Sequence, residues 1–568
     1  MTAGFGSSFQ YGYNVFVINY AAEFIKSFYN ETYRWRNHIS IDHSLLLFQW
    51  GLTVSFFPVG GMVGSLLVAP LADNCGRKRT LQVNNILAII SAVLMGCSRA
   101  VHSFEFIIFS RLVIGICAGI SFSVVPMYLT EIAPENLRGA IAITGHFFII
   151  FGSLMARIFG LDKLLGTQEG WPFLLSLTGV PALFQLIFLP FFPESPRYLL
   201  IQRHDEKAAR EVLQRLRCQD DVESEIEELH QENVSVRAEK EMNTMKLLCN
   251  QGLRWQIISV VILMSGQQLT GVNAVFYYSE RIYATLRIKK QEARYITVLS
   301  SIFIAISLMI VVYTVDSVGR RILLLTGFGI CSILCILLTM TLELQDTMPW
   351  MSYVTSVFFL LLIFGHILGP GPIPNVIILE LFLQPSRSIA FMLGGFVHWF
   401  LHFIMGMIFI QIETRIGSYT FLLFWPLCIF SFVYIFKVIP ETNGKTFLEI
   451  KKYMLAMAKK VKVQVQVPIR RTSKDKDRRR LTRHSIRSES VRQDSVRQDS
   501  IRRDSTRRDS DRRDSGRRDS SRRDSGRRDS SRRDSGRRDS SKRDSSAKRD
   551  STKRKESIKR KRKPTITS

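Results

Sequence analysis

The 568-residue sequence is poor in the features that mark disulfide-bonded proteins, metalloproteins and enzymes. It has eight cysteines and no C-x-x-C pair, so we expect no disulfide framework. Cys331 and Cys335 are one helical turn apart in an apolar run, where packed thiols are expected rather than metal ligands. We find no nucleophile–base set and no metal-ligating cluster, and therefore expect no catalytic residues, no metal and no cofactor.

Net charge is almost absent from residues 1–450, which carry 32 Lys and Arg against 31 Asp and Glu. This region instead contains apolar runs of about 20 residues, the length with which a helix crosses the hydrocarbon core of a bilayer. No basic residues precede the first run, which argues against a cleavable signal peptide. Twelve spans are predicted, at 4–22, 44–69, 81–98, 104–129, 140–160, 171–192, 254–279, 295–315, 322–342, 351–381, 389–412 and 418–439. The sequence thus predicts an all-α, multi-pass membrane protein.

Basic residues indicate the orientation of these spans. They follow the even-numbered spans, at Arg77, Lys78, Arg79, Arg138, Arg197, Arg203, Arg320, Arg321 and Arg387. By the positive-inside rule these connections and both termini are cytoplasmic, although the basic stretch 281–294 on the outer side runs against the rule. Asn30-Glu31-Thr32 then falls in the first outer loop and is a candidate glycosylation acceptor.

Three charged motifs occur twice at nearly the same offset. Asp73-Asn-Cys-Gly-Arg77 recurs as Asp316-Ser-Val-Gly-Arg320, the spacing of Glu131 and Arg138 recurs in Glu380 and Arg387, and Pro193-Glu194-Ser195 recurs as Pro440-Glu441-Thr442. A duplicated unit of six spans predicts two pseudo-symmetric halves, 1–197 and 254–450, as in transporters that rock two halves about a midplane site. The polar linker 198–253 is predicted to form amphipathic cytoplasmic helices at 205–217 and 223–239.

The repeated charges have two interpretations. Pairs of Asp73 with Arg77, Glu131 with Arg138 and Glu194 with Arg197, and their counterparts in the second half, can act as a cytoplasmic gate that breaks when the pore opens inward. Alternatively, they anchor helix ends and fix the topology. We favour the gate, with modest energy from each solvated pair.

Polar groups inside predicted spans usually face a cavity. Gln267, Gln268 and Asn273 lie close together in the seventh span, and amides can both donate and accept, as sugar hydroxyls require. The alternative is that they pack helices together. The Gly- and Pro-rich stretch 369–374 interrupts the tenth span, and His398-Trp399 offers either an aromatic binding face or core packing.

His146 and Arg157 are eleven residues apart in the fifth span and so lie on one helix face. An Arg within a membrane rarely faces lipid, although Arg157 lies near the outer end, where its side chain can snorkel to the interface. Both placements of Arg157 stay open at this point.

Taken together, these motifs resemble the facilitative hexose transporters, in the sugar porter branch of the major facilitator superfamily, with the greatest similarity to fructose-transporting members. The resemblance rests on residues 9–14, 193–197, 266–268, 371–374 and 397–399. It implies facilitated diffusion of a hexose at the plasma membrane. It also implies that the sugar contacts Tyr11, Gln267, Gln268, Asn273, His366, His398 and Trp399.

The sequence departs from this family at four positions. His146 and Arg157 each stand where the family carries Gln, His402 replaces Asn, and Asn375 replaces an apolar residue or Trp. We keep His146 as a substrate-binding candidate. Groups that can be cationic would favour an anion, so a uniporter of urate or another organic anion is an alternative function. The chain also starts inside the first span, which leaves open whether Met1 is the natural start.

Residues 451–568 carry a net charge of +27, and from about Lys459 onward the chain has almost no apolar residues and repeats a unit of the form x-Arg-Arg-Asp-Ser. Such a tail is predicted to be disordered. It would be attracted to anionic inner-leaflet lipids and released by phosphorylation by basophilic kinases. A low-complexity expansion without function, or a non-transporting paralogue acting through the tail, are the alternatives; we expect no nucleic-acid partner.

Overall fold

The computed structural model describes residues 1–237, 253–275, 290–345, 347–348, 350–445, 449–450 and 452–456. Every regular element among them is helical. These described residues belong to one compact unit. Most of the tail predicted to be disordered, and residues 238–252 of the linker, lie outside the described residues.

The ordered chain extends beyond the predicted boundary at residue 450. Residues 452–456 are helical, and Met454 is buried together with Ile450 in the large central hydrophobic cluster. An apolar side chain just past residue 450 is therefore still buried.

The N-terminal half contains six helical passages. Its elements are η1 (Gly4–Ser8), α1 (Phe9–Asn37), α2 (His43–Cys75), α3 (Arg77–Cys97), α4 (Phe104–Ile132), η2 (Glu135–Leu137), α5 (Arg138–Phe159), α6 (Trp171–Ser176), α7 (Gly179–Phe188) and η3 (Leu189–Phe191). The sixth passage is broken between α6 and α7, shortly before Pro181. Proline cannot donate a backbone hydrogen bond, and its ring crowds the preceding turn.

The C-terminal half also contains six passages. Its elements are α11 (Arg254–Gln268) with the helical residues 272–275, α13 (Lys290–Val318), α14 (Arg320–Leu344), α15 (Met351–Leu368), α16 (Ile373–Leu381), α17 (Gln384–Ile416), η5 (Gly417–Leu423) and α18 (Trp425–Val438). Between α15 and α16 the predicted interruption of the tenth span is confirmed. In the seventh passage the break lies at Gly271, whose φ of +87° suits glycine alone.

Eleven helical segments among the described residues are long and apolar enough to cross a membrane. The first predicted span is not one of them, because α1 is too polar. Its polar groups are nevertheless paired inside the N-terminal half: Gln10 Nε2 donates to Asn85 Oδ1 (3.3 Å), and Asn14 Nδ2 donates to Thr178 Oγ1 (2.6 Å). Since polar groups are tolerated in a membrane when protein satisfies them, α1 serves as the twelfth span.

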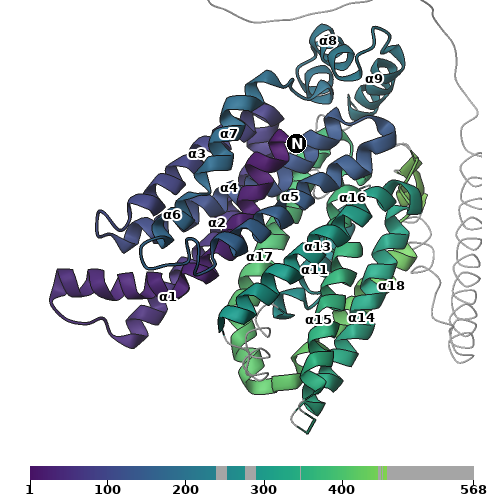
Figure 1. The fold of residues 1–568 in the computed structure, drawn as a ribbon. Coiled ribbons are helices and arrows are strands. Elements are labelled where there is room, and N and C mark those ends of the chain that lie inside the picture. Colours follow the sequence, from purple (N-terminus) through teal and green to yellow (C-terminus); the bar gives the residue numbers. More distant parts are fainter. Residues whose placement is uncertain are drawn as a thin grey trace, which may run out of the picture. The chain divides into compact units, whose positions relative to one another are not determined.

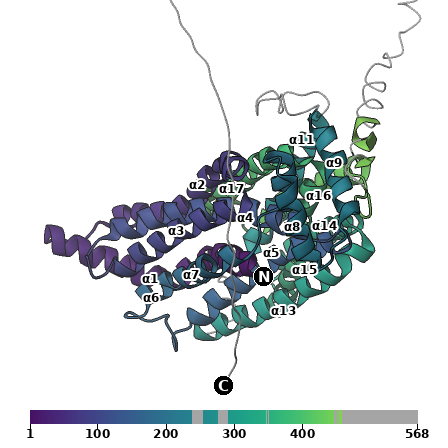
Figure 2. The same cartoon turned by 90° about the horizontal axis from the view of Figure 1, so that it is seen from above.

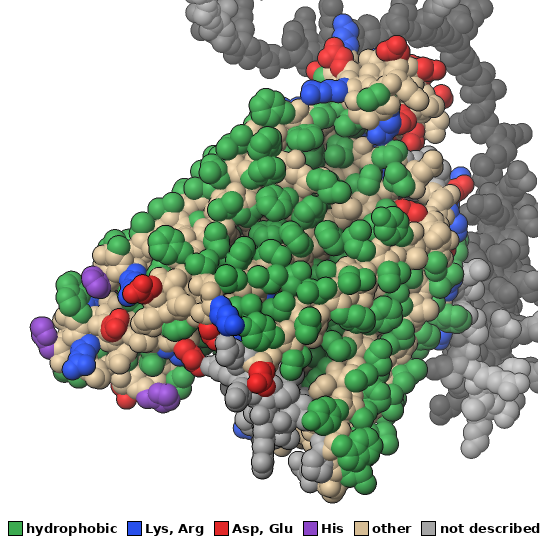
Figure 3. Space-filling model, viewed as in Figure 1, with side chains coloured by type: hydrophobic (Ala, Val, Ile, Leu, Met, Phe, Trp, Pro, Cys, Tyr) green, Lys and Arg blue, Asp and Glu red, His purple; other side chains and the backbone are tan. Residues whose placement is uncertain are grey.

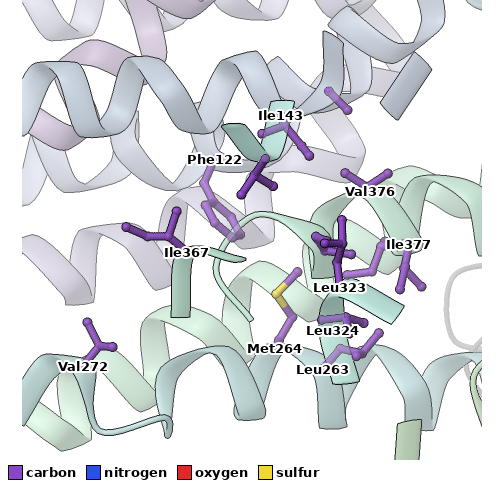
Figure 4. Close-up of a cluster of buried hydrophobic side chains, with 14 of the residues drawn as sticks. Phe122, Ile143, Leu263, Met264, Val272, Leu323, Leu324, Ile367, Val376 and Ile377 are labelled. Atoms are coloured by element: carbon purple, nitrogen blue, oxygen red, sulfur yellow. The ribbon is translucent and has the colours of Figure 1, made fainter. Parts of the chain in front are cut away.

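The two halves pack against each other through equivalent spans. The second span of the N-terminal half, α2, lies along the fifth of the other half, α17, while α5 lies along α13 (Figures 1 and 2). These reciprocal contacts have the two-fold relation expected of a duplicated unit. Phe122, Ile143, Ile367 and Val376 come from both halves and belong to one buried hydrophobic cluster (Figure 4).

The flank of the molecule is apolar. Figure 3 shows hydrophobic side chains covering the sides of the helices and charged ones gathered toward the ends. Exposed large residues such as Leu66, Ile310 and Phe436 belong to this surface. An apolar band of this extent is suited to lipid contact.

The linker forms the predicted amphipathic helices, α8 (Glu206–Arg217) and α9 (Glu223–Arg237), after a turn η4 (Tyr198–Gln202). Leu213 of α8 and Ile226 and Leu229 of α9 bury their side chains in one cluster with Leu383, which lies between α16 and α17. The linker is therefore packed onto the C-terminal half. We call the end of the bundle that carries α8 and α9 the linker end.

The expected position of Asn30 in a loop is wrong. Helix α1 continues to Asn37, so Asn30 lies within a helix, exposed, while Thr32 is 1% exposed. Helix α1 extends past its apolar part because Tyr29 and Thr32 are buried against the N-terminal half.

Candidate functional site

A hydrogen-bonded network of amides and one imidazole lies between the halves. Gln267 Oε1 is 2.8 Å and Gln268 Nε2 is 2.9 Å from His398 Nδ1. Gln268 Oε1 accepts from Asn273 Nδ2 at 3.0 Å, and Gln267 Nε2 donates to the carbonyl oxygen of Gly371. All four side chains can donate or accept, so a ligand with many hydroxyl groups can replace these internal bonds one for one.

Broken helices position this network. Helix α11 ends at Gln268, which lets Asn273 fold back onto the Gln268 side chain. The carbonyl of Gly371 is free to accept because it lies in the break between α15 and α16. Irregular backbone at membrane depth is tolerated where it is buried in protein or lines a cavity, which is where transporters bind their substrates.

Aromatic rings surround His398. Tyr11 Oη is 3.4 Å from His398 Nε2, Phe122 stacks on the imidazole at 4.3 Å between ring centroids, and the Tyr11 and Trp399 rings are 5.2 Å apart. Trp399 is fully buried, and a Cβ on Gly61 would lie 2.2 Å from its ring. Trp399 Nε1 has no hydrogen-bond partner among the described residues. Trp399 is thus a core residue that still presents a free donor.

Two further predicted residues lie beside this network. His366 Nδ1 is 2.9 Å from Thr270 Oγ1, in the break that follows α11. His146 lies near His366 and His398, and its Nδ1 is buried without a partner among the described residues. Asn375 is one of the four positions at which the sequence departs from the family, and its Oδ1 is also buried without a hydrogen-bond partner among the described residues. Because an unsatisfied buried polar atom costs about 1–3 kcal/mol, such atoms indicate where ligand hydroxyls would bind.

Arg157 does not join this network and does not extend toward a lipid interface. The residue is only 5% exposed, and its guanidinium contacts α13 of the other half: Nη1 donates to Thr297 O at 3.2 Å and to Ser301 Oγ. The group also stacks on Phe16 at 4.3 Å. Of the two placements left open by the sequence, snorkelling is thereby excluded.

At the linker end, the charged motifs of the N-terminal half pair with other motifs or with the linker rather than within themselves. Arg77 Nε is 3.0 Å from Glu131 Oε2, with both side chains inaccessible to solvent, and Arg387 Nη1 is 3.9 Å from Glu131 Oε1. Arg138, the partner predicted for Glu131, lies instead 3.8 Å from Glu228. The predicted pairing was wrong because the turn between α4 and α5 points the two side chains toward different neighbours.

Arg197 pairs with the linker instead of Glu194. Its guanidinium contacts Glu232 and lies 3.0 Å from Glu228. Burial alone would lower the pKa of Arg197, but the carboxylates of Glu232 and Glu228 raise it above its usual value. Burial would likewise raise the pKa of Glu232, yet Arg197 and Arg387 lower it below its usual value. This pair is therefore charged on both sides.

The repeated motifs have matching geometry in both halves. Glu194 accepts from the backbone N–H of Arg77 at 3.1 Å, at the start of α3, as Glu441 does from that of Arg320 at 2.9 Å, at the start of α14. The preceding glycines have φ of +92° and +98°. A Cβ there would also lie within 3 Å of the carboxylate, so only glycine fits.

The two copies differ in how their acidic residues are used. Arg320 pairs with Asp316 at 2.8 Å, as predicted. Arg320 also pairs with Glu380 at 3.1 Å, although the sequence predicted Arg387 as the partner of Glu380. Asp73, the counterpart of Asp316, instead accepts from Gln202 at 3.1 Å and from Ser388 at 2.7 Å. The predicted pair of Asp73 with Arg77 is therefore replaced by neutral donors.

Several of these contacts join the two halves. They include Glu131 with Arg387, Asp73 with Ser388, and Asp316 Oδ2, which accepts from the backbone N–H of Ala140 at 2.9 Å. Glu232 of α9 lies 3.6 Å from Arg387 and also contacts Arg197. We call this set of contacts the linker-end network.

Glu228 and Glu232 were not among the residues predicted from the sequence. They are one helical turn apart on α9, on the side that carries the buried Leu229. One signal in the sequence could have identified them. They are two acidic residues one turn apart, next to the apolar face of a linker helix, and basic residues flank the linker.

Comparison with known proteins agrees with this architecture. The family model described as "Sugar (and other) transporter" matches residues 1–453. This chain belongs to the sugar transporter family. Within the family, it is 50% identical over 466 residues to the rat facilitated glucose transporter member 5, covering 82% of this chain and 92% of the relative. It is 49% identical over 452 residues to human facilitated glucose transporter member 7, covering 80% and 88%.

A solved member of the fold is the proton:xylose symporter XylE, bound to 6-bromo-6-deoxy-D-glucose. The TM-score is 0.69 at 22% identity, covering 79% of this chain and 97% of that one. At this identity the likeness shows the fold, and the predicted major facilitator architecture is confirmed. The resemblance of this sugar transporter family member to the facilitative hexose transporters is likewise confirmed by its relatives at about half identity.

Proposed function

We propose that this protein carries a hexose, fructose or glucose, across the plasma membrane by facilitated diffusion with alternating access. The observation that carries the proposal is the network of Gln267, Gln268, Asn273 and His398, which lies at the break after α11 and reaches the break between α15 and α16. The facilitated glucose transporters to which the chain is about half identical support it.

Sugar binding would exchange hydrogen bonds rather than create a charged site. Each hydroxyl donates once and accepts twice, which suits amides whose present partners are other neutral groups. The free atoms of His146 and Trp399 supply additional partners, and the faces of Tyr11 and Trp399 suit the C–H surface of the ring. Together with His366, these are the residues that we assign to the substrate.

The linker-end network would act as the gate. Its contacts join the halves at the end where α8 and α9 lie, so opening that end requires Arg387 to leave Glu131 and Ser388 to leave Asp73. Both termini and this end would face the cytoplasm. The substrate would then enter from the opposite side and leave when the network breaks.

Transport would be passive. The part of α1 that faces the centre, residues 9–22, contains no carboxylate, and the buried Arg111 donates to the backbone oxygen of Asn14 at 2.9 Å. With no acid at this position, α1 offers no group that takes up a proton near neutral pH. We therefore expect uptake to follow the sugar gradient alone.

Two surface features complete the proposal. Asn30 is exposed at the side opposite the linker end and remains our candidate glycosylation acceptor. The basic tail is proposed to bind anionic inner-leaflet lipids and to be a substrate of basophilic kinases.

The test is uptake of labelled fructose, glucose and urate into proteoliposomes that contain the purified chain. We expect uptake of a hexose, and its loss in Gln268→Ala and His398→Ala. Gln256→Ala is the matched control, because Gln256 is a buried amide of the same helix that donates to the Leu381 carbonyl outside the network. Uptake of urate without hexose would overturn the proposal in favour of an anion carrier, as would hexose uptake that survives both network substitutions.

A further inference from the structure

A second group of polar contacts joins the halves far from the linker end. Arg138 begins α5 beside α9, and Arg157 lies 19 residues later, about 28 Å along the helix axis. Around Arg157 the two halves contact each other through polar side chains of α1, α5, the segment after α5, and α13. We call this group the far-end cluster; it consists of Tyr20, Arg157, Asp162, Arg294, Thr297 and Ser301.

Arg157 is the most buried charged member of the cluster. It reaches from α5 to two oxygens of α13, the Thr297 carbonyl at 3.2 Å and the Ser301 hydroxyl, which is itself 1% exposed. Separating the halves here would strip the guanidinium of both hydrogen bonds. Hydrogen bonds to a charged group are stronger than neutral ones, so this contact resists separation.

The remaining members reinforce the same contact. Asp162 forms an ion pair with Arg294 across the halves, and Tyr20 Oη is 3.2 Å from Thr297 Oγ1. The guanidinium of Arg294 lies over the Tyr20 ring at 5.6 Å. The Tyr20 ring in turn packs on the end of α5, where a Cβ on Gly160 would be 2.5 Å from it. Residues from three separate elements thus converge on α13.

Among the side chains that the structure describes, the pseudo-symmetric interface shows a weaker contact at this end. In the equivalent α2–α17 pair, the polar side-chain contact that joins the two helices near their far ends is Ser55 Oγ with Met407 Sδ, at 3.6 Å. A thioether is a weak acceptor. Among the described side chains, the two equivalent interfaces thus differ at the far end, with a charged donor in one and a weak thioether acceptor in the other.

We propose that the far-end cluster is a second lock between the halves, which opens and closes in opposition to the linker-end network during transport, and that Arg157 is its principal residue. This inference rests on the alternating-access part of the proposed function. It assigns Arg157 to the conformational equilibrium and not to substrate recognition. Losing the hydrogen bonds of a charged donor corresponds to roughly a ten- to hundredfold change in that equilibrium.

The test measures the opening of the far end directly. Spin labels are attached to cysteines introduced at Leu164 and Glu292, exposed residues on opposite sides of the cluster, after the exposed Cys97 and Cys218 are replaced by serine. Electron–electron distance distributions are then recorded for the full chain in liposomes. In Arg157→Met we expect the population with long distances to rise about tenfold or more relative to the short one.

A charge exchange separates the lock from a general loss of stability. Asp162→Arg alone should lengthen the distances, and combining it with Arg294→Asp should return them to the parent distribution. Ser55→Ala is the matched control at the symmetric interface and should leave them unchanged. Since Asp162 is half-exposed, these variants are informative even if Arg157→Met does not fold.

The proposal of a second lock would be overturned if the distances between the spin labels were unchanged in Asp162→Arg. It would also be overturned if Ser55→Ala changed these distances as much as Asp162→Arg does. The distances do not depend on which substrate is carried. If the lock variants behave as expected while the parent moves no hexose, the lock stands and the proposed function fails.

Discussion

The two ends of the bundle hold the halves together in different ways. At the linker end, Arg77 and Glu131 are both fully buried and Arg387 adds a second guanidinium. In the far-end cluster, Arg157 binds neutral oxygens, and the ion pair of Asp162 with Arg294 has an aspartate that is 46% exposed. Buried charges cannot lose a partner cheaply, whereas a half-exposed pair is replaced by water at little cost. The strength of each lock therefore depends on how far its charged side chains are shielded from solvent.

This difference predicts the resting state. The linker-end network combines buried ion pairs with the linker helices, so it should be the more stable of the two closures. We expect the unliganded protein to be closed at the linker end most of the time, and substrate to enter from the far end.

The largest effect is expected at Glu131. Glu131→Gln leaves Arg77 buried without its carboxylate partner and leaves Arg387 with Glu232 alone, which should lower the free energy of unfolding by about 3–5 kcal/mol. Thermal unfolding in detergent measures this as a lower melting temperature. The control is the symmetric Glu380→Gln, which should cost less than half as much because Arg320 keeps Asp316 at 2.8 Å. Equal losses of melting temperature in Glu131→Gln and Glu380→Gln would contradict this explanation.

Glu232 should come next. Glu232→Gln weakens the contacts of α9 with Arg197 and Arg387 and should destabilise the docked linker by about 2–3 kcal/mol, the scale of a hydrogen bond to a charged group. Hydrogen exchange of α9 amides should accelerate accordingly. Glu227→Gln is the control, because Glu227 is an exposed carboxylate of the same helix. Exchange that is equally fast in both variants would contradict a locking role for Glu232.

The contribution of Glu232 to stability should depend on pH. The pKa of Glu232 is lowered in the folded protein, so its contribution to stability is complete above the ordinary glutamate value of about 4.3 and is lost as the pH falls through the lower folded value. The difference in melting temperature between the parent and Glu232→Gln should thus be constant from pH 8 to about 5 and shrink below about 4. A difference that grows on acidification would reverse the sign and refute this assignment.

The smallest effect is expected at Asp162. Asp162→Asn removes one half-exposed ion pair and should cost about 0.2–1 kcal/mol, with the difference reduced at high salt. Melting temperatures at low and high ionic strength measure it. A loss as large as that of Glu131→Gln would mean that the far end is the stronger lock.

The sequence predicted the architecture well because its signals are local. Apolar runs of membrane length and a twice-repeated set of charged motifs required the twelve spans and the two halves. The break before α16 followed from the Gly- and Pro-rich stretch 369–374. The amphipathic linker helices were predicted from the helical spacing in residues 205–217 and 223–239.

Residue partners were predicted less well. Nearness in sequence suggested Glu131 with Arg138 and Glu194 with Arg197, yet helix ends that are distant in sequence meet in space and supply Arg77, Glu228 and Glu232 instead. For Arg157, the sequence allowed a side chain that faces either a lipid interface or a cavity. The structure instead places its guanidinium against α13 of the other half.

The sequence by itself therefore determined the spans, their duplication and the candidate binding amides, because chain length, hydropathy and repeated motifs act within a segment. Only the tertiary structure decided which charges pair, which polar atoms stay free and where the halves are held together. Those properties depend on burial, and burial is set by residues that are far apart in the chain.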